Sequence, residues 1–231
     1  MKKLIVIFMV SCSGSFCFSQ EVSMAPVTNI TDGPGNSLEE YLSIHFAQTY
    51  SRFRYRDSEG NKDTDLSYDF KSSYGFNYTK FFTPEIFIRP ELGYKNLGAV
   101  SILNNQKMDW SMHYLDLNGG GGYLKKIGNF PLIPYGGLSL YISYLYKASQ
   151  TLGVNYYDML ANKGIKRMDF GVNLFAGGKY AFSGTNAVFI EIRNSTGLHQ
   201  LEKNTEDGQS QKLFNRAVSF HFGVSFNIIK N

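Results

Sequence analysis

The stretch LSYDFKSSYGFNYTK, residues 66–80, decides the fold because it alternates between two kinds of side chain. The bulky apolar or aromatic positions are Leu66, Tyr68, Phe70, Tyr74, Phe76 and Tyr78. The small or polar positions are Ser67, Asp69, Lys71, Ser73, Gly75, Asn77 and Thr79. A period of two is that of a strand with two unlike faces. If the aromatic face points inward, the protein is a soluble sandwich or barrel, and if it points outward, its solvent is lipid.

The first 19 residues, MKKLIVIFMVSCSGSFCFS, have the layout of a secretory signal peptide. Two lysines are followed by a short apolar run and then by small residues. Cys17 and Ser19 have the spacing for cleavage before Gln20. Lipidation at Cys12 is the alternative. We therefore expect residues 1–19 to be removed on export.

The export segment contains both cysteines of the chain, Cys12 and Cys17. Its removal leaves no thiol for a disulfide or a metal site. It also removes two lysines, which lowers the formal charge from +4 to +2, too weak a bias to indicate a nucleic-acid partner. Residues 20–37, rich in Pro, Gly and Asn, predict a flexible periplasmic lead-in to one domain over residues 38–231. That domain has no apolar run approaching the roughly 18 residues of a spanning helix.

Strand patterns then follow to the end of the chain. The eight patterns cover residues 42–53, 66–80, 86–95, 108–123, 138–146, 168–182, 188–195 and 218–228. The first changes phase between Tyr50 and Phe53, which indicates a bulge, and the fourth changes phase after Tyr114. Short connections at 81–85, 126–130 and 183–186 alternate with long ones at 56–65, 96–107, 147–164 and 202–212. This alternation predicts an up-and-down meander.

The size of the side chains indicates which face meets water. The interior of an eight-stranded barrel is only just wide enough to be filled by side chains. Stripes of Tyr, Phe, Ile, Leu and Trp are too bulky for it, whereas the opposite faces, rich in Gly, Ser, Ala and Asn, fit. An apolar belt around a whole barrel is untenable in water, but lipid requires it, and closure satisfies every backbone group. We therefore predict an all-β, closed, antiparallel, eight-stranded up-and-down transmembrane β-barrel.

The alternation of short turns and long loops, behind an export signal, is typical of bacterial outer-membrane proteins. In that setting the short turns and both termini face the periplasm, and the long loops face outward. Tyrosines near the strand ends suit the interfacial girdles of such barrels. We expect outer-membrane lipids and the barrel insertion machinery as partners, and neither a cofactor nor nucleic acid.

The last strand resembles the C-terminal signal that the insertion machinery reads in outer-membrane barrels, polar-x-Gly-x-x-aromatic-x-apolar. The matching residues are His221, Gly223, Phe226 and Ile228. Ile229-Lys230-Asn231 follows, where many members of the family stop on an aromatic residue.

The whole mature chain resembles small eight-stranded outer-membrane proteins, and in particular the PorT-like barrels of Bacteroidota. The resemblance is carried by Tyr114-Leu115-Asp116-Leu117 leading to Gly122-Tyr123, and by Pro134-Tyr135 and Gly136-Gly137. Asn118 and a glycine run stand where the family pattern has a proline. The resemblance implies an envelope protein, with a link to protein secretion or gliding.

Charged residues on the small face predict a polar interior. They are Asp69, Lys71, Arg89, Glu91, Lys95, Asp169, Lys179, Glu191 and Arg193. Pairing among them would plug the barrel, and the alternative is an ion path. The narrow interior favours the plug.

The four histidines, His45, His113, His199 and His221, also fall on the small face. His45 and His221 lie on the strands that must close the barrel, so we expect them to be neighbours. A luminal metal or pH-sensitive site is one interpretation. A hydrogen-bonded network without a ligand is the interpretation we favour.

Some eight-stranded barrels modify lipid A with Ser, His and acidic residues. Glu191, Ser195 and His199 share a face here, but successive members are four residues apart, roughly 13 Å along a strand. A catalytic triad needs contacts near 3 Å, so these three cannot form one among themselves.

Residues 147–164 contain NYYDMLANKG, which predicts a helical turn. Its Tyr156, Tyr157 and Met159 would either contact an envelope partner or pack across the barrel mouth. We predict a non-enzymatic structural or interaction protein of the envelope. The alternatives are a narrow channel for small solutes and a lipid A-modifying enzyme.

Overall fold

The structure is a computed structural model that describes residues 39–56, 66–103, 105–128, 131–161, 164–183, 186–202 and 212–228. The predicted export signal with Cys12 and the predicted lead-in lie outside these ranges. The described strands are β1 (Glu40–Arg56), β2 (Ser67–Phe81), β3 (Ile86–Leu103), β4 (Gln106–Leu124), β5 (Leu132–Leu152), β6 (Asn155–Asp158), β7 (Met168–Ser183), β8 (Asn186–Gly197) and β9 (Lys212–Asn227). Across those ranges, we find no helix with the length and apolar character needed to cross a bilayer.

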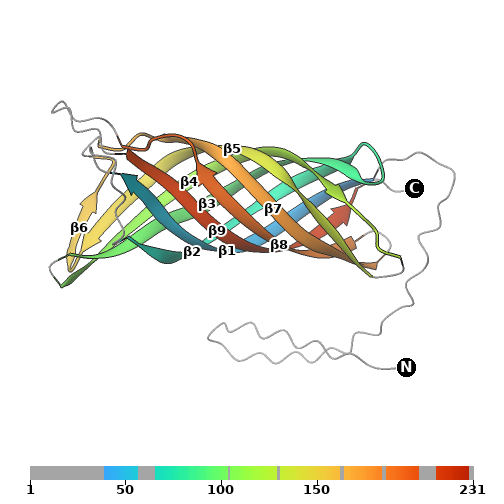
Figure 1. The fold of residues 1–231 in the computed structure, drawn as a ribbon, viewed down its shortest axis with the longest axis horizontal. Coiled ribbons are helices and arrows are strands. Elements are labelled where there is room, and N and C mark those ends of the chain that lie inside the picture. The colour runs from blue at the N-terminus through green and yellow to red at the C-terminus, as the bar shows by residue number, and fades with distance from the viewer. Residues whose placement is uncertain are drawn as a thin grey trace, which may run out of the picture.

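Eight of the strands close into a tilted barrel (Figure 1). They pair antiparallel in the order β4-β3-β2-β1-β9-β8-β7-β5, and pairing of β4 with β5 completes the ring. The first and last strands pair without a break from Tyr41↔Asn227 to Arg56↔Lys212. Each barrel strand therefore has a hydrogen-bonding neighbour on both sides, which is the arrangement that lipid demands. The predicted closed, up-and-down, eight-stranded barrel is confirmed, with the short β6 added on β5.

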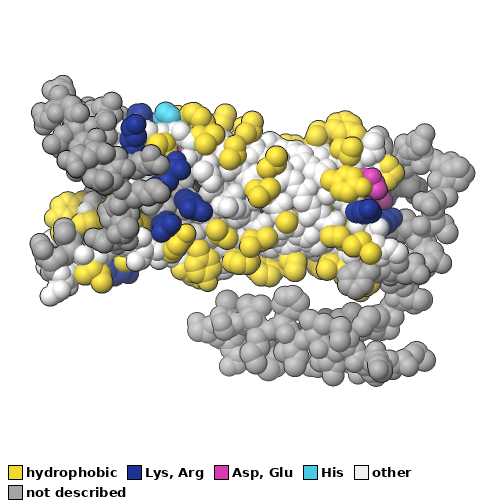
Figure 2. Space-filling model, in the orientation of Figure 1, with side chains coloured by type: hydrophobic (Ala, Val, Ile, Leu, Met, Phe, Trp, Pro, Cys, Tyr) yellow, Lys and Arg dark blue, Asp and Glu magenta, His cyan; other side chains and the backbone are white. Residues whose placement is uncertain are grey.

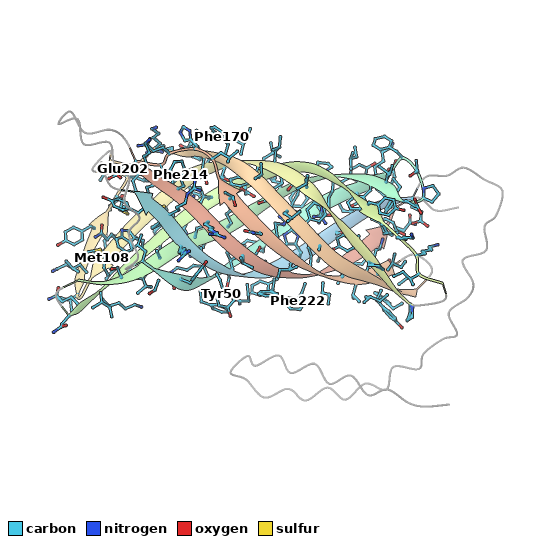
Figure 3. All side chains as sticks on the ribbon, viewed as in Figure 1. Tyr50, Met108, Phe170, Glu202, Phe214 and Phe222 are labelled. Carbon is cyan, nitrogen blue, oxygen red and sulfur yellow. The ribbon has the colours of Figure 1, made fainter. Side chains whose placement is uncertain are left out.

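Side chains alternate between the two faces of the wall as the sequence predicted. Figure 3 shows Tyr50, Phe170 and Phe222 pointing away from the barrel, and Phe222 is 51% exposed. On β9 the residues of opposite parity, His221 and Ser225, are buried. The outer surface is a belt of exposed Leu, Ile, Phe and Tyr side chains from every barrel strand. Such a belt is stable when hydrocarbon surrounds it.

The two ends of the barrel differ. We call the end where β1 begins and β9 finishes the termini end, and the opposite end, which carries β6, the loop end; they lie at the right and left of Figure 1. The connections at the termini end are short, as predicted: Phe81 to Ile86, Leu124 to Leu132 and Ser183 to Asn186.

Two connections at the loop end differ from the prediction. Residues 96–107 are not a long loop, because β3 and β4 continue until Leu103 pairs with Gln106. Residues 155–158 form strand β6 rather than a helical turn. Beyond the apolar belt both faces of a hairpin can meet water, so polar residues there do not end a strand.

The two predicted phase changes are also wrong. The register between β1 and β9 is continuous through Phe53, which is buried inside the barrel. Met112 and Tyr114 of β4 are also buried, and the irregularity beside them lies on β5, at Tyr146. The physical reason is that bulky residues fill the mouth of the barrel at the loop end, where they form one apolar cluster.

The glycine run of β4 gives a matched test of the inward and outward faces. A Cβ on Gly120 would lie 2.3 Å from the carbonyl oxygen of Leu138, whereas a Cβ on Gly119 would meet nothing within 4 Å. We expect Gly120→Ala to lower the free energy of unfolding by about 1–3 kcal/mol, as overpacking does, and Gly119→Ala to change it little. Urea unfolding of the refolded barrel, followed by gel mobility, measures both. Equal effects would mean that the assignment of faces is wrong here.

Candidate functional site: the charged interior

Ion pairs cross the barrel from one wall to the other. Strands β3 and β8 lie on opposite sides of the ring, separated by β2, β1 and β9 on one side and by β4, β5 and β7 on the other. Arg89 of β3 donates to both carboxylate oxygens of Glu191 on β8, at 2.6 and 3.2 Å. Arg193 of β8 donates to both oxygens of Glu91 on β3, at 2.7 and 2.9 Å. The two walls therefore hold each other through a pair of bidentate contacts.

These four residues form a neutral unit, which we call the central ion cluster. Arg193 also donates to Glu191, at 2.9 and 3.2 Å, so the two bidentate contacts are linked. All four side chains are buried. Bidentate arginine–carboxylate pairs are among the strongest polar contacts, and charge balance makes their burial tolerable. The guanidinium of Arg89 also lies 4.2 Å from the ring centre of Phe175.

Two histidines lie beside the cluster. The ring centres of His45 and His221 are 5.0 Å apart, so the predicted neighbours do lie together. Nε2 of His45 is 3.9 Å from Glu91, and Nε2 of His221 is 2.8 Å from the hydroxyl of Ser219. Across the described ranges, His, Cys, Asp and Glu side chains form no group of three or more that could hold a metal ion.

The other two histidines face outward, which corrects the prediction that all four point inward. Nδ1 of His113 lies 2.6 Å from the hydroxyl of Tyr94, on the outer surface. The ring centre of His199 is 5.0 Å from that of Phe170, which is one of the exposed belt residues. His113 was misplaced through the wrong phase of β4, and His199 because it follows the end of β8 at Gly197.

A second polar layer lies next to the central ion cluster. Lys95 pairs with Asp116 at 2.6 Å, and its ammonium is 3.7 Å from the ring centre of Tyr141. The Tyr141 hydroxyl donates to Asp169 at 3.3 Å, and the amide of Asn215 donates to the same carboxylate at 2.8 Å. Sequence reasoning missed Asp116 and Asn215 as interior residues. Consistent parity along β4 and β9 would have found both.

The remaining predicted interior charges lie apart from this centre. Lys71 pairs with Asp69 at 2.5 Å and with Asp109 at 3.4 Å, towards the loop end. The ammonium of Lys179 lies 3.0 Å from the ring centre of Tyr41, at the termini end. The nine charged residues therefore form several separate contacts rather than one network.

Apolar side chains fill the interior at both ends. The cluster at the termini end contains Phe81, Phe87, Leu124 and Phe175. The larger cluster at the loop end includes Phe53, Leu97, Met112, Leu145 and Leu201, with Met159 and Leu160 packed against it. Two cavities of ≈ 40 Å³ each lie inside the described barrel, one beside Phe81 and Phe87 of the termini-end cluster and the other beside Glu91 and Arg193. Because one water needs about 10–15 Å³, each cavity has room for a few water molecules.

The residues considered for lipid A chemistry do not come together. Glu191 is committed to the two arginines of the central ion cluster. Ser195 lines the interior cavity, whereas His199 packs on the outer surface against Phe170.

The comparison with solved structures identifies the fold. Neisserial surface protein A aligns over 82% of this chain and 97% of its own, with a TM-score of 0.50 and 14% identity. The chain has the fold of a small outer-membrane β-barrel. AlkL in lipid bilayers (TM-score 0.47, 12% identity, 90% and 98% coverage) and Ail of Yersinia pestis in complex with the heparin analogue sucrose octasulfate (0.44, 14%, 83% and 99%) are also similar. No protein-family model matches the chain, and no curated protein matches it.

The central ion cluster predicts a marked asymmetry between single and paired substitutions. Arg193→Met leaves Glu91 buried without its bidentate partner, and we expect it to lower the free energy of unfolding by about 3–5 kcal/mol. The double substitution Arg193→Met with Glu91→Leu should recover a substantial part of that loss, because no uncompensated charge remains. Urea unfolding in lipid bilayers measures both. Lys80→Gln, in an exposed pair with Glu40, is the control and should have little effect. A double variant no more stable than the single one would contradict this account.

Proposed function

We propose that this chain is a non-enzymatic outer-membrane β-barrel that acts as a structural or interaction protein of the bacterial envelope. The observation that carries the proposal is the central ion cluster, which joins opposite walls of the barrel. With its interior committed to holding the walls together, the barrel offers its surface and its ends for function.

The filled interior argues against the alternative of a narrow solute channel. At the level of the central ion cluster, contacts of 2.6–3.2 Å link β3 to β8. The cavities on either side have room for a few water molecules each. Permeation along the barrel would require the central ion cluster to break and both apolar clusters to move aside.

We further propose that the termini end faces the periplasm and the loop end faces outward. Outer-membrane barrels place their short turns on the periplasmic side. The C-terminal insertion signal suits this orientation, because it would lie where the insertion machinery binds. Phe226 and Ile228 of this signal are exposed on the outside of the barrel, and His221 is buried inside.

The PorT-like resemblance supports a finer proposal, a subunit of a secretion or surface assembly. The residues that carry it lie on the neighbouring strands β4 and β5, where Tyr123 pairs with Gly136. A partner could contact β6 and the turn before it, since Val154 is 98% exposed and Tyr156 is 60% exposed. Met159, in contrast, packs against the interior cluster and so closes the mouth.

Planar-bilayer conductance tests the closed interior. We expect the chain refolded from Gln20 onward to give no discrete current steps, because the ion pairs and both apolar clusters block the lumen. The preparation must first show the gel-mobility shift on boiling that marks a folded barrel. Reproducible single-channel steps from such material would overturn the proposal in favour of a channel.

Fluorophore labelling tests the membrane assignment separately. A chain starting at Gln20 has no cysteine, so a single cysteine can carry the probe. We expect a probe on Phe222→Cys to report lipid and to be quenched by spin-labelled acyl chains, because Phe222 lies on the exposed belt. A probe on Val154→Cys, beyond the belt, is the control and should report water. A Phe222 probe in water would contradict a membrane-spanning barrel.

A further inference from the structure

The outward face of β1 and β9 changes character abruptly near the loop end. Tyr50 contacts Phe70 and Phe220, with ring centres 4.8 and 6.4 Å away, as part of the exposed aromatic belt. Aromatic residues of this kind mark the boundary between hydrocarbon and headgroups. Tyr50 lies opposite Val218, and beyond this pair the next outward positions on the two strands are Arg52 and Arg216. Both arginines therefore lie at the level of the lipid headgroups.

Arg52 and Arg216 are directly opposite each other in the register of β1 and β9. Like charges directly opposite across two strands destabilise a sheet. Arg54 is the next outward residue on β1, and its guanidinium lies 4.7 Å from the ring centre of Phe214. We call Arg52, Arg54 and Arg216 the arginine row. The strand pairing thus concentrates three guanidinium groups on one small outer surface.

No acid among the described residues forms an ion pair with the arginine row, and Nε of Arg54 is buried there without a hydrogen-bond partner. Two other cations at the barrel ends are paired: Lys107 with Asp109 at 3.3 Å, and Lys80 with Glu40 at 2.9 Å. Lys147 and Arg167, like the arginine row, form no ion pair with an acid among the described residues. Figure 2 shows several Lys and Arg groups near the loop end of the visible face. At the termini end, basic and acidic groups lie side by side.

We propose that the arginine row binds the phosphate groups of lipid headgroups in the leaflet at the loop end. A guanidinium presents a planar fork that matches phosphate oxygens, and it is weakly hydrated enough to bind at an interface. Residues directly opposite on two strands have Cβ atoms only about 4.5–5.5 Å apart, so Arg52 and Arg216 can reach one phosphate together. A phosphate between them turns their mutual repulsion into two attractive contacts.

The ligand class follows from the place and the charge. In a zwitterionic headgroup, an attached cation balances the negative charge of the phosphate. A phosphate monoester on a lipid has no such cation, so its negative charge can pair with a guanidinium of the protein. The arginine row therefore fits a phosphorylated lipid of the lipid A type better than a phosphatidylcholine. This inference rests on the proposal that the barrel spans a membrane. It adds a lipid-binding site, which the proposed structural role of the protein does not require.

Acidic residues of the chain itself are the competing partner. Residues 57–65 and 203–211, which lie outside the described ranges, carry Asp57, Glu59, Asp63, Asp65, Glu206 and Asp207. Pairing with these acids would stabilise the arginine row in any bilayer, whereas a lipid phosphate acts when that lipid is present. The two explanations therefore predict different dependence on lipid composition.

The test compares melting temperatures in nanodiscs of phosphatidylcholine with and without phosphorylated lipid A. Lipid A from which both phosphates have been removed is the matched control for the phosphorylated form. We expect phosphorylated lipid A to raise the melting temperature of the native barrel, and the dephosphorylated form to raise it less. Arg52→Gln with Arg216→Gln should lose most of that difference while melting no lower in phosphatidylcholine, because the repulsion between the two arginines is also gone. Lys107→Gln, a paired cation at the same end, should keep the full shift.

Three results would overturn the proposal. The first is an equal melting temperature of the native barrel with both forms of lipid A. The second is a double variant that is destabilised by the same amount in every nanodisc, which would mean that the arginines pair within the protein. The third is a shift that inorganic phosphate reproduces in phosphatidylcholine nanodiscs, which would mean a site for free anions. A failure of the barrel to enter nanodiscs, seen by gel mobility, would instead count against the membrane-spanning barrel itself.

Discussion

The pairing of Arg89 and Arg193 with Glu191 and Glu91 is the interaction on which the interior of this barrel depends. The apolar side chains point outward, so the polar faces of all the strands meet in a narrow space. That space is too small for much water, and every charge placed in it must find a partner from another strand. Because β3 and β8 lie on opposite sides of the ring, their ion pairs satisfy the charges and fix the separation of the two walls together.

Much of the fold could be predicted from the alternation of side chains. The period of two, and the conflict between bulky stripes and a narrow interior, gave the closed barrel and its outward aromatic face. The same reasoning failed for Phe53, Met112 and Tyr114, which are bulky and yet face inward. It treated the interior as uniform along the axis, whereas a barrel with an apolar cluster at its mouth takes large residues there. A more reliable rule is that alternate residues of a strand keep facing the same side, because the side changes only where the register of the strand shifts.

The interior site was harder to predict than the wall. Sequence parity placed all four members of the central ion cluster on the inner face, but it could not show which pairs would meet across the lumen. The tilt and stagger of the strands determine which inward residues meet across the lumen, and the local sequence pattern specifies neither. Asp116 and Asn215 were missed for simpler reasons. Asp116 was left out although its neighbours Leu115 and Leu117 were predicted to face outward, and Asn215 precedes residue 218, where the predicted last strand begins. The arginine row emerged from the register of β1 with β9, which joins residues far apart in the chain.

The seam between β1 and β9 has a consequence for how the molecule assembles. These strands share a continuous ladder but come from the two ends of the described chain. To bring residues so distant in sequence together, the chain must lose loop-closure entropy before the contacts between them add any stability. Proteins with such topologies therefore fold slowly. Until β9 has arrived, β1 and β8 are open edges whose backbone groups have no partner in hydrocarbon. A chain that lacks β9 therefore leaves two unpaired strand edges, and formation of the seam between β1 and β9 completes the ring.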